Sequence, residues 1–313
     1  MYSERLPWIA EDPASQKLFE LAQRVAAVPT TILISGESGT GKKYLARLIH
    51  ELGPRRDTPF LQINSTALPG KLVEAELFGY ERGGFPGAGE RKLGAFELGL
   101  KGTVMLEEVA GLLPATQEKL LHVLQEQKLE RLGGKESVRV EARLMAITEV
   151  DLPSAVKEGR FRSDLYQRLD MAKIWVPPLR ERPADILPLA EHLLGIVRTE
   201  HGKPQARLGE KTKALFEAYG WPGNVGELAG VLRRVVTHAK GETLEPEDFP
   251  AGIQEAGKRT ESGNGNLPAL EDVEREAIRE TLEATEYQIG KSAQILGISR
   301  KTLLEKRKKF GMK

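Results

Sequence analysis

The fold is decided by Gly36-Glu37-Ser38-Gly39-Thr40-Gly41-Lys42, a glycine-rich stretch between an apolar, β-branched run (31–35) and an amphipathic segment (43–52). Glycines let backbone N–H groups turn inward around phosphate oxygens, and the N-terminus of a following helix adds its positive dipole end. Lys42 supplies a point charge for the β and γ phosphates. An ordinary strand-to-helix turn with an exposed lysine is the alternative, but the two flanking patterns favour a nucleotide-binding P-loop.

Outward from this turn, short apolar runs alternate with helical patterns, which is typical of a parallel sheet with crossover helices. The expected strands are residues 31–35, 60–64, 104–106, 144–148 and 174–176. After Pro177 and Pro178 the strand patterns stop, and helical patterns follow at 184–199, 210–219 and 224–240. We expect a tail (1–14), an α/β domain (15–183), a smaller helical domain (184–253), a linker rich in Gly, Glu, Lys, Ser and Asn (254–268) and a final helical domain (269–313).

The composition excludes several kinds of site. The chain has no cysteine, which removes disulfides, thiol nucleophiles and cysteine-ligated zinc. Its 46 Lys and Arg against 45 Asp and Glu give a net charge of +1, so bulk charge neither favours nor opposes nucleic acid as a partner. No run approaches the ~20 apolar residues of a membrane span, and no signal peptide precedes the first domain. We expect no membrane partner and a cytoplasmic protein.

Two acids, Glu107 and Glu108, follow the expected strand 104–106 and are the candidates for holding a metal ion. Lys43 stands where P-loops commonly carry the Ser or Thr that binds magnesium, so Mg²⁺ accompanying ATP must rely on acids elsewhere. A carboxylate pair at the carboxyl end of a buried parallel strand lies beside the phosphates. Acidic pairs are also common on solvated surfaces, so the pair alone is a weak indication.

Further motifs carry a resemblance to a known family. They occur in order at residues 76–79, 120–125, 159–169, 177–182 and 221–225. With the P-loop, they resemble the central domain of bacterial enhancer-binding proteins, the AAA+ activators of sigma-54 RNA polymerase, over residues 15–249. The resemblance implies an AAA+ P-loop parallel-sheet core with a helical lid. It also implies a hexameric or heptameric ring with ATP sites at subunit interfaces, in which hydrolysis moves a surface loop that remodels the promoter complex.

The resemblance also implies roles for single residues. Glu108 polarises the attacking water, and Asn64 orients that glutamate. Arg162 and Arg168 resemble arginine fingers, which reach the γ-phosphate of a neighbouring subunit and offset transition-state charge. The expected nucleotide-binding residues are Gly36, Glu37, Ser38, Gly39, Thr40, Gly41, Lys42, Lys43 and Glu107.

Four positions depart from the family pattern. Glu107 replaces an aspartate, which puts the magnesium geometry in doubt. The first sensor, normally Thr-Asn, is Thr148-Glu149, which brings a negative charge near the phosphates. Gly226 replaces the arginine of the second sensor. The sigma-contacting loop, normally Gly-Ala-Phe-Thr-Gly-Ala, consists of Gly83, Gly84, Phe85, Pro86, Gly87 and Ala88, in which proline removes an N–H and the threonine hydroxyl is lost.

The C-terminal segment resembles a Fis-type helix-turn-helix, an all-α DNA-binding domain. Helices are expected at 269–285, 289–296 and 300–310, with Gly297-Ile298-Ser299 as the turn and Ser299 as the N-cap of the last helix. Such a run of basic residues is also common on a solvated helix face. We expect contacts to promoter-upstream DNA, the upstream activating sequence, from Ser299, Arg300, Lys301, Thr302, Lys306 and Arg307.

Two functions from different classes stay open. One is an ATPase that opens sigma-54 promoters, and the other is a nucleotide-binding DNA-binding regulator whose motor is degenerate. Because both arginines persist beside an altered pocket, a related hypothesis is that the chain completes a neighbour's site in a mixed ring. Only about a dozen residues precede the resemblance, so we expect regulation by a separate partner, by expression level or by ring assembly.

Overall fold

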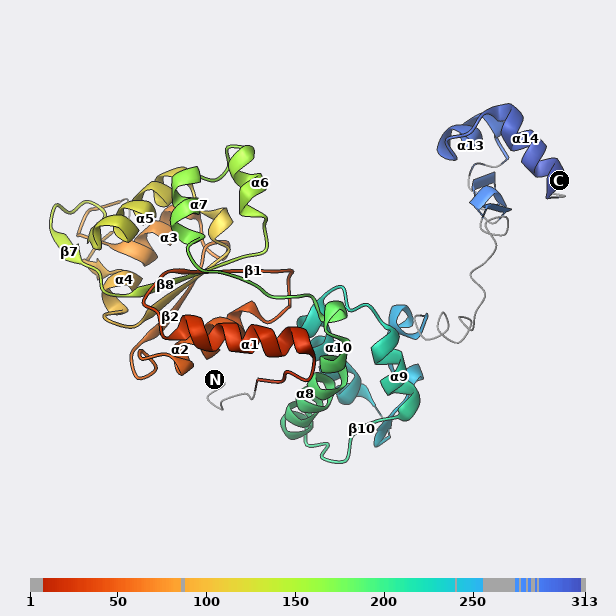
Figure 1. The fold of residues 1–313 in the computed structure, drawn as a ribbon, viewed down its shortest axis with the longest axis horizontal. Helices are drawn as coiled ribbons and strands as arrows, with labels where there is room; N and C mark the ends of the chain where they lie inside the picture. Colours follow the sequence, from red (N-terminus) through yellow and green to blue (C-terminus); the bar gives the residue numbers. More distant parts are fainter. Residues whose placement is uncertain are drawn as a thin grey trace. The chain divides into compact units, whose positions relative to one another are not determined.

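The computed structural model describes residues 8–85, 88–239, 241–255, 274–275, 277–279, 281–282, 285 and 287–310. The chain divides into two compact units, Met1–Gln254 and Glu255–Lys313 (Figure 1). In the part that the structure describes, no helix combines the length and the apolar character needed to cross a membrane.

A five-stranded parallel sheet forms the core of the first unit, which confirms the α/β prediction. Its strand order is β2-β5-β8-β1-β9. The strands are β1 (Ile32–Ser35), β2 (Phe60–Asn64), β5 (Thr103–Glu107), β8 (Arg143–Thr148) and β9 (Lys173–Trp175). Asn64 pairs in register with Glu107, and Ser35 with Thr148. The carboxyl ends of these strands therefore meet at one edge of the sheet.

Helices cover both faces of the sheet because its side chains alternate between two apolar cores. Ile32 and Ile34 pack in one core with α1 (Pro13–Ala26) and α2 (Lys42–Leu52), whereas Leu33 belongs to the other. Figure 1 shows α1 and α2 on one side and α3, α5 and α7 on the other. The helices of this second side are α3 (Gly70–Phe78), α5 (Pro114–Glu126), α6 (Leu152–Lys157) and α7 (Ser163–Leu169). Each fully buried aliphatic side chain stabilises the fold by about 1.5 to 3 kcal/mol.

Two small hairpins and a short helix lie beside this second layer. They are β3 (Gly79–Tyr80) with β4 (Lys92–Leu93), β6 (Lys128–Glu130) with β7 (Ser137–Arg139), and α4 (Ala95–Leu98). Arg131, only 4% exposed, joins them through Glu81 (2.9 Å), Glu97 (2.6 Å) and Glu136 (3.1 Å). These ion pairs hold the base of the loop between β3 and β4.

The helical part of the first unit contains α8 (Ile186–His201), α9 (Glu210–Ala218) and α10 (Asn224–His238). Its core is built around Phe216 and Trp221, whose rings meet edge to face at 5.1 Å. The sequence predicted helices alone here, but a parallel two-stranded pair, β10 (Arg207–Leu208) with β11 (Thr243–Leu244), joins them. Strands of two residues are too short for a periodic pattern to predict them.

The second unit contains α13 (Ile289–Ile295) and α14 (Arg300–Lys309). Ile278, Leu282, Ala293 and Leu303 form its apolar core. The turn and the Ser299 N-cap lie where the sequence predicted them, since the Ser299 hydroxyl accepts from the Thr302 amide (3.1 Å). The expected linker lies almost entirely outside the described residues, as does much of the expected helix at 269–285.

Candidate functional site

The P-loop connects the end of β1 to the start of α2 and lies against the helical part of the first unit, which corresponds to the helical lid expected from the sequence. Gly39 and Gly41 have positive φ angles of 74° and 100°, which glycine adopts without strain. A Cβ on Gly39 would lie 2.2 Å from the Gly223 carbonyl oxygen, so no other residue fits there. The Gly226 amide donates to the Gly39 carbonyl oxygen (3.1 Å). The sheet and the lid thus share the P-loop.

Asn224 is the buried side chain that fixes this contact. Its Nδ2 donates to the Ser38 carbonyl oxygen (2.8 Å), and its Oδ1 accepts from the Leu179 amide (2.7 Å). Arg182, 3% exposed, donates to the Thr40 carbonyl oxygen (2.7 Å), and burial lowers its pKa. These side chains hold the loop in shape from the lid side.

Glu37 is tied to the same elements. Both its carboxylate oxygens accept from Arg180 (2.5 and 2.8 Å), and one also accepts from Asn224 Nδ2 (3.3 Å). The Arg180 guanidinium, and then the Asn224 amide, lower the pKa of Glu37 to about 2. Glu37 therefore stays ionised and acts here as a tether of the loop.

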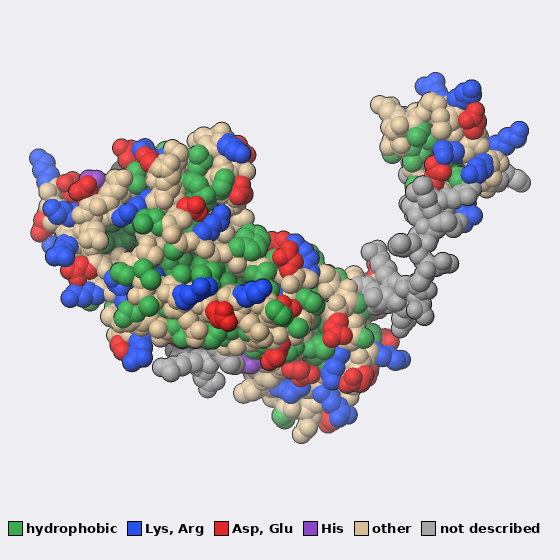
Figure 2. Space-filling model, in the orientation of Figure 1, with side chains coloured by type: hydrophobic (Ala, Val, Ile, Leu, Met, Phe, Trp, Pro, Cys, Tyr) green, Lys and Arg blue, Asp and Glu red, His purple; other side chains and the backbone are tan. Residues whose placement is uncertain are grey.

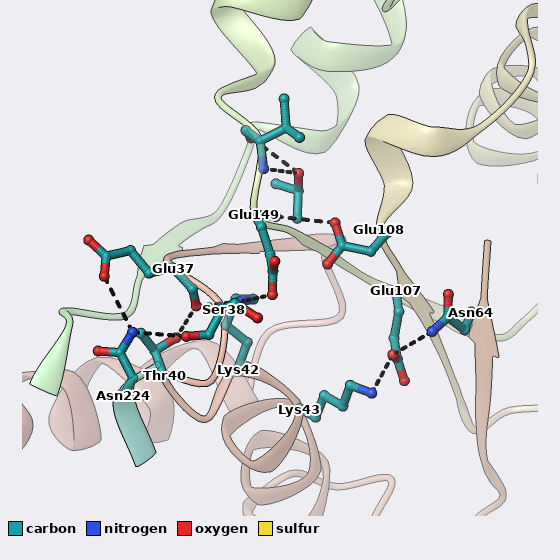
Figure 3. Close-up of polar contacts among 12 residues, drawn as sticks. Glu37, Ser38, Thr40, Lys42, Lys43, Asn64, Glu107, Glu108, Glu149 and Asn224 are labelled. Carbon is teal, nitrogen blue, oxygen red and sulfur yellow. Dashed lines mark hydrogen bonds and ion pairs between the residues drawn. The ribbon is translucent and has the colours of Figure 1, made fainter. Parts of the chain in front are cut away.

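Lys42 is almost fully buried, with 5% of its side chain exposed. Its ammonium donates to the Glu37 carbonyl oxygen (2.6 Å) and forms an ion pair with Glu149 (3.0 Å), which lies just after β8 (Figure 3). The P-loop lysine, expected to hold phosphate, is thus paired with a carboxylate of the chain itself.

Lys43 makes a second ion pair, with Glu107. Its ammonium lies 2.6 Å from Glu107 Oε2, and the glutamate side chain is only 7% exposed (Figure 3). Asn64 Nδ2 donates to the same oxygen (3.3 Å). Magnesium prefers six oxygen ligands, and an ammonium offers none. No group of three or more His, Asp or Glu within the described ranges could hold a metal ion. In this structure Glu107 is bonded to Lys43 and Glu108 is not, and magnesium at these two acids stays a prediction.

Glu108 turns away from Glu107 because its backbone is left-handed, with φ 53° and ψ 50°. Such a conformation in a residue with a Cβ costs on the order of 1 kcal/mol or more and is typical of functional sites. The Glu149 amide is 3.4 Å from Glu108 Oε2. Burial, and then the negative charge of Glu149, raise the pKa of Glu108.

Asn64 and Thr148, to which the resemblance gives roles in hydrolysis, are both held by hydrogen bonds to neighbouring backbone groups. Asn64 Oδ1 accepts from the Thr66 amide (2.9 Å), and its amide group contacts Glu107 rather than Glu108. The Thr148 hydroxyl donates to the Val150 carbonyl oxygen (3.1 Å) and accepts from the Val150 amide (3.0 Å).

The two arginines of the finger motif lie on α7 and at its start. Arg162 is 41% exposed and binds Asp164 through two contacts (3.1 and 2.8 Å). Arg168 donates to the Leu124 carbonyl oxygen (2.8 Å) and lines a cavity of about 280 Å³ with Arg55 and Arg143. That cavity lies near the amino ends of β1 and β8, away from the P-loop.

The described part of the sigma-contacting loop is closed by backbone hydrogen bonds. The Gly83 amide donates to the Ala88 carbonyl oxygen (2.8 Å), and the Ala88 amide donates to the Phe85 carbonyl oxygen (3.0 Å). The Phe85 ring packs edge to face on Tyr80 at 4.9 Å. Gly84 lies against Leu132. Pro86 and Gly87 lie outside the described residues.

The expected DNA-contact residues differ in exposure along α14. Arg300 and Lys301 are exposed at its first turn, whereas Arg307 is half-buried. Lys306 pairs with Glu274 (2.6 Å) within the same unit. Figure 2 shows several groups of Lys and Arg side chains on the visible face of this unit. The first turn therefore offers its charges to a partner more directly than Lys306 does.

Sequence reasoning missed the residues that hold the P-loop from the lid, namely Arg180, Arg182 and Asn224. They belong to motifs that the sequence analysis quoted, at 177–182 and 221–225, but their partners lie about 140 to 190 positions away along the chain. The two lysine–glutamate pairs were also missed. The partners in each pair lie far apart along the chain, so no local pattern indicates them.

Three family models match the chain in succession. A sigma-54 interaction domain matches residues 8–175, an AAA+ ATPase lid domain matches residues 180–266, and the Fis family of bacterial regulatory proteins matches residues 269–310. These matches confirm the resemblance that the motifs indicated.

Relatives span most of the chain. The response regulator protein PilR of Pseudomonas aeruginosa is 40% identical over 309 residues, which cover 97% of this chain and 69% of PilR. The sigma54-dependent transcriptional activator SfnR of Pseudomonas putida is 39% identical over 312 residues, which cover 93% of this chain and 85% of SfnR. A crystal structure of NtrX from Brucella abortus in complex with ADP has a TM-score of 0.73 and 32% identity, covering 98% of this chain and 70% of NtrX. A second NtrX structure, in complex with ATP, has a TM-score of 0.72 and 30% identity.

The parallel-sheet core, the lid on the P-loop and the capped C-terminal helix agree with these matches in order and extent. The chain belongs to the sigma-54-dependent transcriptional activators, with an AAA+ nucleotide-binding domain and a Fis-type helix-turn-helix DNA-binding domain.

Proposed function

We propose that this chain is a transcription regulator that binds ATP at the P-loop in an oligomeric ring, binds promoter-upstream DNA, and hydrolyses ATP slowly by itself. The ion pair between Lys42 and Glu149 is the observation that carries the proposal. The NtrX structures with ADP and ATP support nucleotide binding by this fold. The ion pair between Lys43 and Glu107 opposes a metal ion on Glu107.

Slow hydrolysis follows from charge at the phosphate position. Glu149 competes with phosphate for Lys42, and its own negative charge repels a nucleotide. It also helps to raise the pKa of Glu108, the residue expected to polarise water. Gly226 adds no cation where the family carries arginine. Loss of a single charge-stabilising contact costs roughly 100-fold in rate.

Binding and hydrolysis are tested separately on the full chain. Calorimetry should detect ATP binding, and Lys42→Ala should abolish it, whereas Lys17→Ala on the exposed side of α1 should not. Phosphate release should stay well below ~1 per second, the lower end of the kinase range. Turnover at or above that rate contradicts weak hydrolysis, and absence of any heat with ATP or ADP contradicts nucleotide binding.

Arg162 favours a second candidate function, completion of a neighbour's site in a mixed ring. Its guanidinium is partly exposed and oriented by Asp164, as a residue that acts on another subunit requires. Mixing the chain with a catalytically intact relative should raise phosphate release, and Arg162→Ala should abolish the increase. Arg160→Ala is the matched control, because Arg160 is exposed nearby and pairs with Glu158. An increase that survives Arg162→Ala opposes this function.

Contact with sigma-54 polymerase is the output we propose for the loop at residues 83–88, weakened by Pro86. In vitro transcription from a sigma-54 promoter with ATP should yield more transcript with Pro86→Thr, which restores an N–H and a hydroxyl. Equal amounts of transcript from the parent and from Pro86→Thr would show that Pro86 does not weaken transcription.

A further inference from the structure

We propose that the Lys43 ammonium takes the place of Mg²⁺, so that the chain binds metal-free ATP; the inference rests on the proposed ATP binding at the P-loop. In many P-loop proteins, a hydroxyl at this position and a strand-end carboxylate hold the metal between them. In this chain the residues at these two positions form an ion pair, since Lys43 Nζ lies 2.6 Å from Glu107 Oε2. A cation is therefore already bonded to the carboxylate.

The burial of the two partners supports this substitution. The Lys43 side chain is 65% exposed, yet its ammonium reaches a carboxylate that is 7% exposed. Asn64 donates to the same oxygen, which fixes the carboxylate from the β2 side. The lysine stem thus runs along the open side of the site, and its charged end lies at the strand ends where phosphates are expected.

An ammonium can bridge carboxylate and phosphate as a metal does. It has three N–H donors, of which one is needed for Glu107. The others suit phosphate oxygens, and the first turn of α2 adds the partial positive charge of the helix N-terminus. Lys43 thereby supplies the cation that otherwise arrives with the nucleotide.

The same geometry disfavours a divalent ion. Mg²⁺ bound to Glu107 would lie about 2.0 to 2.1 Å from an oxygen, with an ammonium close to that oxygen as well. Two cations so close repel strongly, so Mg²⁺ on Glu107 would require the Lys43 ammonium to withdraw from that carboxylate. The pair and the metal are therefore alternatives.

The test measures ATP affinity of the full chain by calorimetry, once with EDTA and once with excess MgCl₂. Affinity in EDTA should be tighter than with magnesium or within about threefold of it. A loss of more than about tenfold in EDTA overturns the inference and leaves ATP binding intact. Absence of binding under both conditions refutes ATP binding itself, and the inference with it.

Variants at position 43 give a second, independent result. Lys43→Thr restores the hydroxyl, so its affinity in EDTA should fall at least about tenfold and recover with magnesium. Lys43→Arg keeps the cation and should stay independent of metal. Since Lys43→Thr leaves Glu107 without its cationic partner, Lys43→Thr combined with Glu107→Asp repeats the test with the shorter acid. The inference is also overturned if both threonine variants bind ATP equally well with and without magnesium while their unfolding temperatures stay near that of the parent.

Discussion

The carboxylate of Glu149 lies 3.0 Å from the ammonium of Lys42, so the residue after β8 neutralises the P-loop lysine. The lysine is 5% exposed and the glutamate 39% exposed, which places the pair at the mouth of the site. A nucleotide that reaches Lys42 must displace this carboxylate or tolerate its charge.

Glu149→Asn should therefore tighten ATP binding. The change removes the competing charge and supplies the amide that the family pattern of the first sensor implies at this position. We expect the dissociation constant to fall by about fivefold or more, since removing one unit charge near the phosphates changes the energy by at least ~1 kcal/mol even in water. Calorimetry measures the change. Glu158→Asn, which removes an exposed acid paired with Arg160, is the control, and equal affinity of all three proteins opposes the role of Glu149.

Asn224→Ala should destabilise the first unit and weaken nucleotide binding. The fully buried amide bonds Ser38 and Leu179, and each buried group left without a partner costs about 1 to 3 kcal/mol. Alanine also fits poorly at the Asn224 φ angle of 54°. Asn224→Gly removes that strain but loses the same hydrogen bonds, so it should recover only part of the stability. Urea unfolding measures both, and a loss below about 0.5 kcal/mol in Asn224→Ala contradicts a stabilising role of the Asn224 hydrogen bonds.

Glu108→Gln should stabilise the protein above neutral pH. Burial and the charge of Glu149 raise the pKa of Glu108 in the folded protein. As pH rises from about 4, the Glu108 carboxyl therefore ionises in the unfolded chain before it ionises in the folded protein. Between the unfolded and folded pKa values the folded state binds more protons, and stability falls with rising pH. Thermal unfolding should show a gain for Glu108→Gln at high pH and none near the unfolded pKa. Glu130→Gln, an exposed acid on β6, should show no such difference. A gain that is independent of pH contradicts the assignment.

Arg131→Ala should cost about 3 to 5 kcal/mol of stability, because it leaves the Glu97 carboxylate, 8% exposed, without its partner. Arg131→Lys keeps the charge but loses the paired contacts to Glu97, so we expect an intermediate loss. Chemical unfolding gives the values. If alanine and lysine variants unfold alike, the charge at this position is not what stabilises the hairpins.

Lys301→Ala should weaken DNA binding more than Lys306→Ala. Lys301 is exposed on the first turn of α14, whereas Lys306 already pairs with Glu274. Removing one phosphate contact should reduce the slope of log affinity against log salt by about 0.9. Fluorescence anisotropy over about 50 to 200 mM salt measures the slope. Equal slopes for the two variants would falsify this division of roles.

Much of the fold could be predicted from local pattern. The glycines of residues 36–42, with a strand before and a helix after, predicted the P-loop because backbone conformation at a turn is set by neighbouring residues. The apolar, β-branched run at residues 31–35 predicted a strand of a parallel sheet, and Ser299 predicted the start of α14 by its capping hydroxyl.

The tertiary structure alone decided the partners of these residues. Nothing in the spacing of the chain indicates that Glu149 neutralises Lys42, that Lys43 holds Glu107, or that Asn224 bonds Ser38. Local pattern depends on backbone geometry over a few residues, whereas an ion pair or a buried hydrogen bond depends on which strand ends meet. That meeting is set by sheet order and lid packing, so the charge of the nucleotide site emerges only when the whole first unit is folded.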